Sequence, residues 1–210
     1  GIHRKLAQAT MEEGGGMQIS AKAATDLLQS SELITHRGNA LIEFVDHYKR
    51  FTRLPDPVMA PVDIRVIFKN IAAYFKEELK QSAITLQTEV SEELPVIGCD
   101  QNLMEQALIN LVRNAIFVLS GQSNGLIVLS AKWNGKNELV LEVSDNGPGI
   151  PPEIQPQVFV PFFTTKQKGT GIGLSIVRKI LNMHGGSIRF QTGEGEGTTF
   201  IARLPQTERN

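Results

Sequence analysis

The sequence predicts an α/β protein built as a two-layer α/β sandwich and preceded by a helical segment. From about residue 58 to residue 205, stretches with the apolar period of helices alternate with stretches that have the two-residue period of half-buried strands. The chain has 210 residues, of which 41% are hydrophobic and 20% charged, so it can bury one sizeable core. A mixed sheet and several helices that share one core pack as two layers.

Upstream of that region the sequence predicts a helix that needs a partner. Apolar residues recur there at helical spacing as a stripe narrow enough for a helix-bundle seam: Ile34, Leu41, Phe44, Tyr48 and Phe51. Pro55 and Pro57 end this helix, because proline removes a donor and pushes its predecessor out of the α region. We therefore divide the chain into a weakly structured or helical segment 1–31, a helical segment 32–54 and a domain 58–205.

Within the domain, capping residues and periodicity predict three helices. Asp63 caps a helix to about Leu79, and Asp100 caps one to about Leu119. A third helix covers Thr170–Met183. The residues expected on the buried faces of the first two are Ile67, Ile71, Tyr74, Phe75, Met104, Ala107, Leu108, Leu111, Ala115 and Val118.

Five strands complete the predicted domain: Ile84–Val90, Gly125–Lys132, Asn137–Ser144, Ser187–Gln191 and Thr198–Leu204. The second and third are joined through Asn134-Gly135, a hairpin turn signal. We therefore expect these two strands to be antiparallel neighbours.

Composition limits the possible partners and the compartment. Twenty-one basic and 22 acidic residues give a net charge of -1, so we expect no nucleic-acid partner, and any polyanion must bind a local site. One cysteine, Cys99, excludes an internal disulfide and fits a reducing, cytoplasmic location. Because the sequence starts at Gly1, we expect a piece of a longer protein, whose upstream part could carry a membrane anchor.

Two asparagines on the helix after Asp100 form the first candidate site. Asn110 and Asn114 are four residues apart, so both amides project from one helix face. An amide oxygen suits Mg²⁺, which combines few protein ligands with phosphate oxygens and water. The alternative is that both amides only hydrogen-bond neighbouring loops.

A second candidate follows the third strand, in Asp145-Asn146-Gly147-Pro148-Gly149-Ile150. The carboxylate stands at the strand end, and the two glycines let backbone approach a flat ligand closely. Asp145 can accept a hydrogen bond from an exocyclic amine. The alternative is an ordinary Asp-Asn-Gly-Pro turn.

The third candidate is a glycine-rich loop that opens a helix, at Lys168-Gly169-Thr170-Gly171-Ile172-Gly173-Leu174. Free N–H groups and the helix dipole converge there on an anion, so phosphate binding is the natural use. It lacks the Gly-Lys-Ser/Thr of a Walker A loop. Before it lies Phe159–Lys166, part of a long segment typical of a lid, in which one or two phenylalanines should belong to the core.

Taken in this order, the segments resemble the GHKL nucleotide-binding family, and within it the catalytic domain of bacterial sensor histidine kinases. ALINLVRNA is similar to the N box, SDNGPGIP to the G1 box, FVPFFTTK to the F box and KGTGIGLSIV to the G2 box. The resemblance covers roughly residues 58–205 and implies the Bergerat α/β sandwich, ATP and Mg²⁺ as cofactors, and a helical hairpin of which residues 32–54 are a remnant. It also implies a homodimeric full-length protein and a response-regulator receiver domain as a partner.

The resemblance also implies residue roles. Asp145 would bind the adenine amino group, Asn114 would hold Mg²⁺, and Asn110 with Lys166 would act near the γ-phosphate. The remaining nucleotide contacts would come from Gly147, Gly149, Ile150, Phe162, Thr165, Lys168, Gly169, Thr170, Gly171, Ile172, Gly173, Leu174 and Thr198. Family members that hydrolyse ATP carry a glutamate general base where Asn110 stands, and an amide cannot take a proton from water. The pattern therefore favours phosphoryl transfer to a histidine over hydrolysis.

Two departures from the family pattern stand out. Phe117 replaces a basic residue that approaches the phosphates in many members. His3, His36, His47 and His184 all lack the acidic follower and proline of the acceptor motif, so we expect a fragment without its acceptor histidine. His184 is expected to be a structural residue at a helix end, where positive charge is favourable. The alternatives are a GHKL ATPase and a nucleotide-sensing module without chemistry.

Overall fold

The computed structural model describes residues 10–11, 17–18, 21–52, 54–135, 137–166 and 169–206. The chain divides into two units, Gly1–Thr52 and Arg53–Asn210. The first unit contains a short antiparallel pair, β1 (Thr10–Met11) with β2 (Met17–Gln18), and the long helix α2 (Ala21–Thr52).

Helix α2 is longer than the helix expected from the sequence, because it begins at Ala21 rather than near residue 32. Ile34, the first residue of the predicted apolar stripe, is 59% exposed. The other four members of the stripe lie outside the described side chains.

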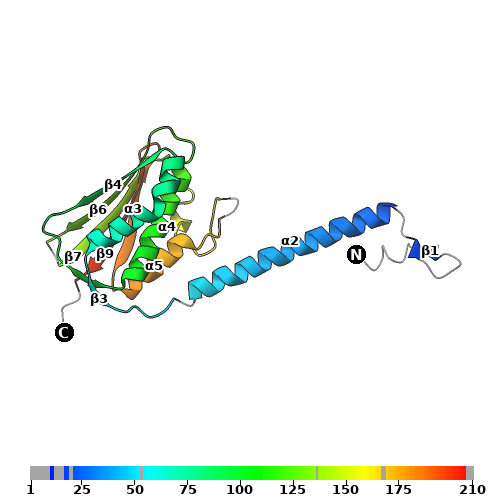
Figure 1. Ribbon diagram of the computed structural model, residues 1–210, viewed down its shortest axis with the longest axis horizontal. Coiled ribbons are helices and arrows are strands. Elements are labelled where there is room, and N and C mark those ends of the chain that lie inside the picture. Colours follow the sequence, from blue (N-terminus) through cyan, green and yellow to red (C-terminus); the bar gives the residue numbers. More distant parts are fainter. Residues whose placement is uncertain are drawn as a thin grey trace. The chain divides into compact units, whose positions relative to one another are not determined.

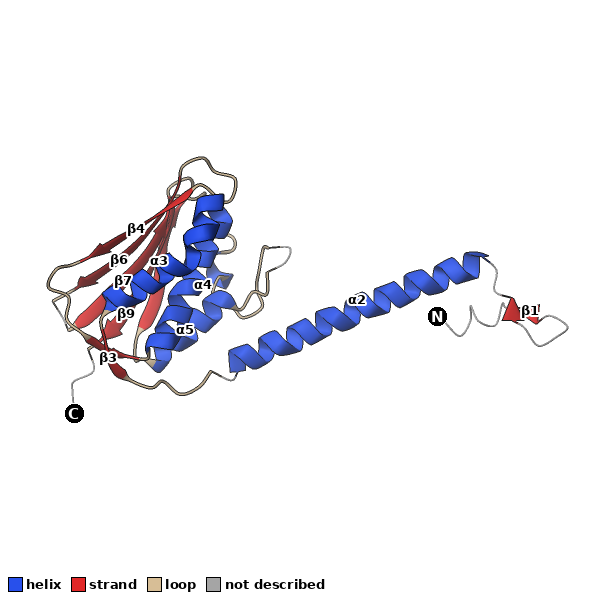
Figure 2. Ribbon diagram, in the orientation of Figure 1, coloured by secondary structure: helices blue, strands red, loops and turns tan. Residues whose placement is uncertain are grey.

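The second unit is a five-stranded sheet with three helices on one face (Figures 1 and 2). This arrangement confirms the two-layer α/β sandwich. The strand order is β4 (Ile84–Val90), β6 (Gly125–Trp133), β7 (Glu138–Asp145), β9 (Gly197–Pro205), β8 (Ser187–Gly193). β4 and β6 are parallel, whereas the other neighbours, including the predicted hairpin β6–β7, are antiparallel.

The covering helices are α3 (Ile64–Gln81), α4 (Gln101–Leu119) and α5 (Gly173–Met183). Both predicted caps form: Asp63 Oδ1 accepts from the Arg65 N–H at 2.9 Å, and Asp100 Oδ1 accepts from the Leu103 N–H at 3.0 Å. The predicted buried faces are confirmed at all positions except Tyr74 and Val118, which are 61% and 36% exposed.

Tyr74 and Val118 lie outside the core for different reasons. The Tyr74 hydroxyl accepts a hydrogen bond from Arg113 at 3.2 Å, so its polar tip stays at the surface while its ring edge packs on Phe75. Val118 lies instead against the loop after β7, in the candidate site described below.

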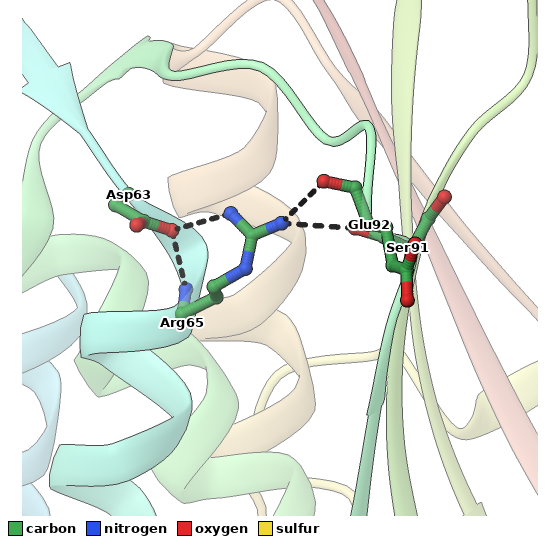
Figure 3. A network of polar contacts seen from close by, with 4 residues as sticks. All are labelled: Asp63, Arg65, Ser91 and Glu92. Atoms are coloured by element: carbon green, nitrogen blue, oxygen red, sulfur yellow. Dashed lines mark hydrogen bonds and ion pairs between the residues drawn. The ribbon is translucent and has the colours of Figure 1, made fainter.

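A short antiparallel pair that periodicity did not predict lies beside the α3 and α4 caps: β3 (Ala60–Val62) and β5 (Ile97–Cys99). Arg65 joins this end of the domain to the end of β4 (Figure 3). Its guanidinium donates to the carbonyls of Ser91 and Glu92, both at 3.0 Å, and pairs with Asp63 at 3.3 Å.

Buried His184 connects the end of α5 to the start of α4. Its Nδ1 donates to the Ile180 carbonyl at 2.8 Å, and its Nε2 accepts from the Asp100 N–H at 3.0 Å. The predicted structural role is therefore found, with both ring nitrogens engaged in hydrogen bonds. Asp100 Oδ2 also accepts from the Val58 N–H, which fixes the segment that enters the domain.

Among the described residues, no helix has the length and apolar character needed to cross a bilayer.

Candidate functional site

One face of α4 lines the candidate site along its whole length. Asn110, Asn114 and Val118 follow one another at four-residue spacing, so they line this face over two turns, about 12 Å. The Asn110 amide nitrogen donates to the Gln106 carbonyl at 3.0 Å, which leaves its oxygen facing the start of α5. A Cβ built on Gly173, the first residue of α5, would lie 3.4 Å from that oxygen.

At the middle of this face, Asn114 contacts the long segment before the glycine-rich loop. Its Oδ1 accepts a hydrogen bond from the Lys166 Nζ at 2.8 Å. The same Nζ lies 4.1 Å from the centre of the Phe117 ring. Burial lowers the pKa of Lys166, and nearby Arg113 lowers it further, because both disfavour the charged form.

At the far end of the face, Val118 meets the loop that follows Asp145. A Cβ on Gly147 would come within 3.0 Å of the Val118 side chain and 2.7 Å of Asp145 Oδ1. Burial raises the pKa of Asp145, and hydrogen bonds from the N–H groups of Gly147 and Thr198 only partly oppose that rise. The carboxylate is therefore partly desolvated, and it stands beside an apolar side chain.

The loop after Asp145 lies against the turn between β8 and β9 with almost no space between the two backbones. Gly149 has φ +82°, and a Cβ there would lie 2.2 Å from the Gly193 carbonyl oxygen. Gly197 has φ +85°, and its Cβ would overlap the Asp145 carbonyl. Only glycine permits both the left-handed conformation and this approach.

Thr192 holds this junction from the side of β8. Its hydroxyl accepts from the Ile150 N–H at 2.9 Å, donates to the Gly197 carbonyl at 3.0 Å, and lies 3.1 Å from the Thr198 hydroxyl. Thr198 is paired with Asp145 across β7 and β9 and is buried. The structure thus brings together the predicted residues Asp145, Ile150 and Thr198.

The glycine-rich loop is built on backbone contacts with Phe162. The Phe162 N–H donates to the Gly171 carbonyl at 2.9 Å, and a Cβ on Gly171, whose φ is +67°, would lie 2.4 Å from the Phe162 carbonyl carbon. Ile172, the N-cap of α5, makes no side-chain capping bond. The N–H groups of the first turn of α5 therefore remain available to an anion.

The other predicted contact residues lie in or beside the glycine-rich loop. The Gly169 N–H donates to the Lys166 carbonyl at 3.1 Å, and the Thr170 hydroxyl lies 3.5 Å from the Ile172 N–H. Thr165 is exposed and Leu174 is half-buried at the start of α5. Lys168 lies outside the described residues. Their contacts with a ligand stay predictions.

The predicted lid is attached to the domain by one of its phenylalanines. Phe159 lies 6.0 Å from Phe190 and 6.3 Å from Phe200, ring centre to ring centre. It is half-buried, as are Phe162 and Phe163, so the expectation that one or two phenylalanines of this segment belong to the core is wrong. Gln155, in the short helix η1 (Gln155–Gln157), donates to the Ile150 carbonyl at 2.8 Å.

Sequence reasoning missed three residues that position the site. The helical period predicts Val118 in the core, and Thr192 carries no sequence signal because a strand threonine belongs to no motif. The pattern Asp-Asn-Gly-Pro predicts only a turn at Asn146, but the Asn146 side chain accepts from the Leu126 N–H and donates to the Asn124 carbonyl, both at 2.7 Å. It fixes the loop after β7 to the start of β6.

Residues 99–208 match the family described as histidine kinase-, DNA gyrase B-, and HSP90-like ATPase. This match covers more than half of the chain, and the chain belongs to that family. Within it, the domain is an ATP-binding catalytic domain of the histidine kinase type, as the four sequence boxes predicted.

Several relatives are sensor kinases. The chain is 35% identical to "Sensor histidine kinase ZraS" of Salmonella typhi over 144 residues, which are 69% of this chain and 30% of that protein. It is 36% identical to "Signal transduction histidine-protein kinase AtoS" of Escherichia coli over 193 residues, 91% of this chain and 31% of that protein. The chain thus spans about a third of the length of these relatives.

Solved histidine kinase structures share the fold. The nucleotide-free catalytic domain of histidine kinase ThkA superposes with a TM-score of 0.64 at 34% identity, over 71% of this chain and 96% of that one. ThkA in complex with the response regulator protein TrrA gives a TM-score of 0.67 at 28% identity, over 87% of this chain and 53% of that one.

Proposed function

We propose that this chain is the kinase part of a two-component sensor protein, which transfers the γ-phosphoryl group of ATP to a histidine for relay to a response-regulator aspartate. One observation carries the proposal: the polarity of the site along α4. A half-buried carboxylate, Asp145, stands at one end, while Lys166 and the N-terminus of α5 stand at the other. An adenine amine fits the first end and a polyphosphate fits the second.

The residues present fit a magnesium ion bound with the nucleotide. Asn114 Oδ1 already accepts from a cation, the Lys166 ammonium, and no cluster of three metal-ligating side chains occurs among the described residues. A single amide oxygen suits Mg²⁺, which takes its remaining ligands from phosphate and water. When bound, the ion would neutralise charge on the transferring phosphoryl group.

The protein's own residues would position the nucleotide for transfer. Asp145 would accept from the adenine amino group, and the N–H groups around Gly171 and Gly173 would bind phosphate oxygens. Lys166 would place positive charge at the terminal phosphate, and Thr165 and Lys168 would add contacts from the same lid. Asn110 faces the start of α5 and offers no base for water, which favours transfer over hydrolysis.

The acceptor would be supplied by a separate segment of the full-length protein. His36 is exposed on α2 but lacks the acceptor motif, and His184 is buried with both ring nitrogens engaged. We propose that α2 belongs to a dimerisation hairpin, that the full-length protein is a cytoplasm-facing homodimer, and that a receiver domain is its partner. The ThkA–TrrA complex supports a regulator partner by similarity.

The test is incubation of the chain with γ-labelled Mg·ATP, with and without an added acceptor-hairpin domain. We expect acid-labile, base-stable label on the added domain and none on this chain. Label on this chain that disappears in His36→Gln or His47→Gln would show that the acceptor was placed wrongly. Steady phosphate release without an acceptor would favour the ATPase alternative, and ATP binding with neither product would favour a sensing module.

A further inference from the structure

Phe117 is an aromatic residue in an exposed position on the helix that lines the nucleotide site. It lies three residues after Asn114 on α4 and is 52% exposed, whereas its neighbours Ala115 and Ile116 are buried. A large apolar side chain that is half exposed beside a polar site contributes little to the core. The contacts of the Phe117 ring indicate a role in the site instead.

The face of the Phe117 ring is occupied by the ammonium group of Lys166. The 4.1 Å distance between Nζ and the ring centre is well within the range of cation–π attraction. The same ammonium donates to Asn114 Oδ1 at 2.8 Å, so the ring and the amide hold it from two sides. The ion pairs of the described residues do not include Lys166.

A second cation in place of Phe117 would work against this arrangement. Arg113 already stands one turn before Phe117 on α4, so this part of the helix carries a cation. A neutral ring attracts the ammonium with its negative face and adds no positive charge of its own. The chain therefore combines an aromatic residue on the helix with a lysine on the lid.

We propose that Phe117 is a positioning residue for Lys166, holding its ammonium over the phosphate end of the site next to Asn114. This inference rests on the proposed role of Lys166 at the terminal phosphate. The positive charge at the phosphate end is then supplied by Lys166 of the lid and not by a residue of α4, and the Phe117 ring determines the position of that charge. Phe117 itself touches no phosphate.

The first measurement is independent of nucleotide. In the NMR spectrum of the full chain, the ring current of Phe117 should shift the Lys166 side-chain methylene protons, which are assigned by their loss in Lys166→Met. Phe117→Leu should abolish the shift, and Phe117→Tyr should preserve it. Lys166 signals that are unchanged in Phe117→Leu would overturn the proposal, even if the protein binds ATP well.

The second measurement is a double-mutant cycle in Mg·ATP affinity, measured by calorimetry on the full chain. Phe117→Leu should weaken Mg·ATP binding roughly two- to thirtyfold, the range of a cation–π contact, and leave adenosine binding unchanged. Phe117→Tyr, which keeps an aromatic ring, should bind Mg·ATP as tightly as the unaltered chain. In a Lys166→Met background, Phe117→Leu should have no further effect, because the ring then has no cation to position.

The possible failures can be told apart. If Phe117→Leu weakened Mg·ATP binding equally in the unaltered and Lys166→Met backgrounds, or weakened adenosine binding, the positioning role would be overturned. Phe117 would then contribute to the stability of the fold instead. If the unaltered chain bound no Mg·ATP, the proposed function would fail. The NMR comparison would still decide whether the ring positions the lysine.

Discussion

The two ends of the nucleotide site are built in different ways. At the base end, Asp145 and Gly149 are held by neighbouring strands and by backbone that approaches backbone so closely that a Cβ at Gly149 would overlap the Gly193 carbonyl. At the phosphate end, Gly171 also packs closely on the Phe162 backbone, but Asn114, Lys166 and Phe117 meet through side chains that come from a helix and a long loop.

This difference determines what each end requires from a ligand. At the base end, the Asp145 carboxylate accepts from two backbone N–H groups that neighbouring residues already hold in place, so a ligand amine would add a further hydrogen bond without displacing a side chain. At the phosphate end, Lys166 already occupies the oxygen of Asn114 that a metal would use. On the proposed role of Asn114, Mg·ATP would replace this existing contact, and phosphate oxygens would then accept from the Lys166 ammonium.

The largest effect should come from breaking the backbone contact at the base end. Gly149→Ala would introduce a Cβ 2.2 Å from the Gly193 oxygen, whereas Gly195→Ala, at a similar φ of +74°, meets nothing within 4 Å. Both changes strain a left-handed residue by about 1–3 kcal/mol, but only the first adds overpacking of about 1–3 kcal/mol. Denaturant unfolding measures the difference, and adenosine binding should be lost only in Gly149→Ala. Equal stability of the two variants would contradict the close approach.

The second effect concerns the carboxylate. Asp145→Asn removes the charge and can present an N–H donor to the adenine amine, where the carboxylate presents only acceptors, so we expect roughly a ten- to hundredfold loss of affinity for both adenosine and ATP. Because burial raises the Asp145 pKa, the free domain of the same variant should have a higher Tm at neutral pH. Calorimetry that showed unchanged adenosine affinity would remove Asp145 from the site.

The pH dependence follows from the same carboxylate. On its proposed role, Asp145 binds the adenine amine in its charged form, and burial raises the pKa of this carboxyl above its ordinary 3.8. Adenosine affinity should therefore fall as the pH drops through that raised value, beginning at a higher pH than an exposed aspartate would produce. The Asp145→Asn variant is the control, because it retains the titration of the ligand itself and loses that of the protein.

The third prediction tests the phosphate end of the site independently of the base end. Asn114→Ala removes the proposed magnesium ligand and should weaken Mg·ATP binding about tenfold, the value of one contact to a charged group. Adenosine has no phosphates, so its binding should not change. A variant that loses both ligands equally would have a folding defect, which a thermal melt would detect.

The sequence predicted one end of the site better than the other. The base end follows from local patterns, because a strand that ends in Asp145 and continues through Gly147 and Gly149 specifies both a carboxylate and close backbone approach. The contact between Lys166 and Asn114 joins residues 52 positions apart, and no periodicity relates a loop lysine to one turn of a helix.

The elements of the fold were predictable for the same reason, and the errors have physical causes. Caps at Asp63 and Asp100 and the strand alternation depend on neighbouring residues, so five strands and three helices were found. β3 and β5 have three residues each, too few to show a period. Val118 is apolar like its buried neighbours, and only the loop packed against it shows that it faces the site.

The smallest effect should come from the hydroxyl that supports the base end from behind. Thr192→Val keeps the shape of the side chain but removes the acceptor of the Ile150 N–H and the donor to the Gly197 carbonyl. A net hydrogen bond is worth about 1 kcal/mol, so adenosine affinity should fall roughly fivefold or less. Thr192→Ser, which retains the hydroxyl, should bind almost normally. If Thr192→Ser lost as much affinity as Thr192→Val, packing of the methyl group would be responsible, and the base end would depend less on hydrogen bonding than its backbone geometry indicates.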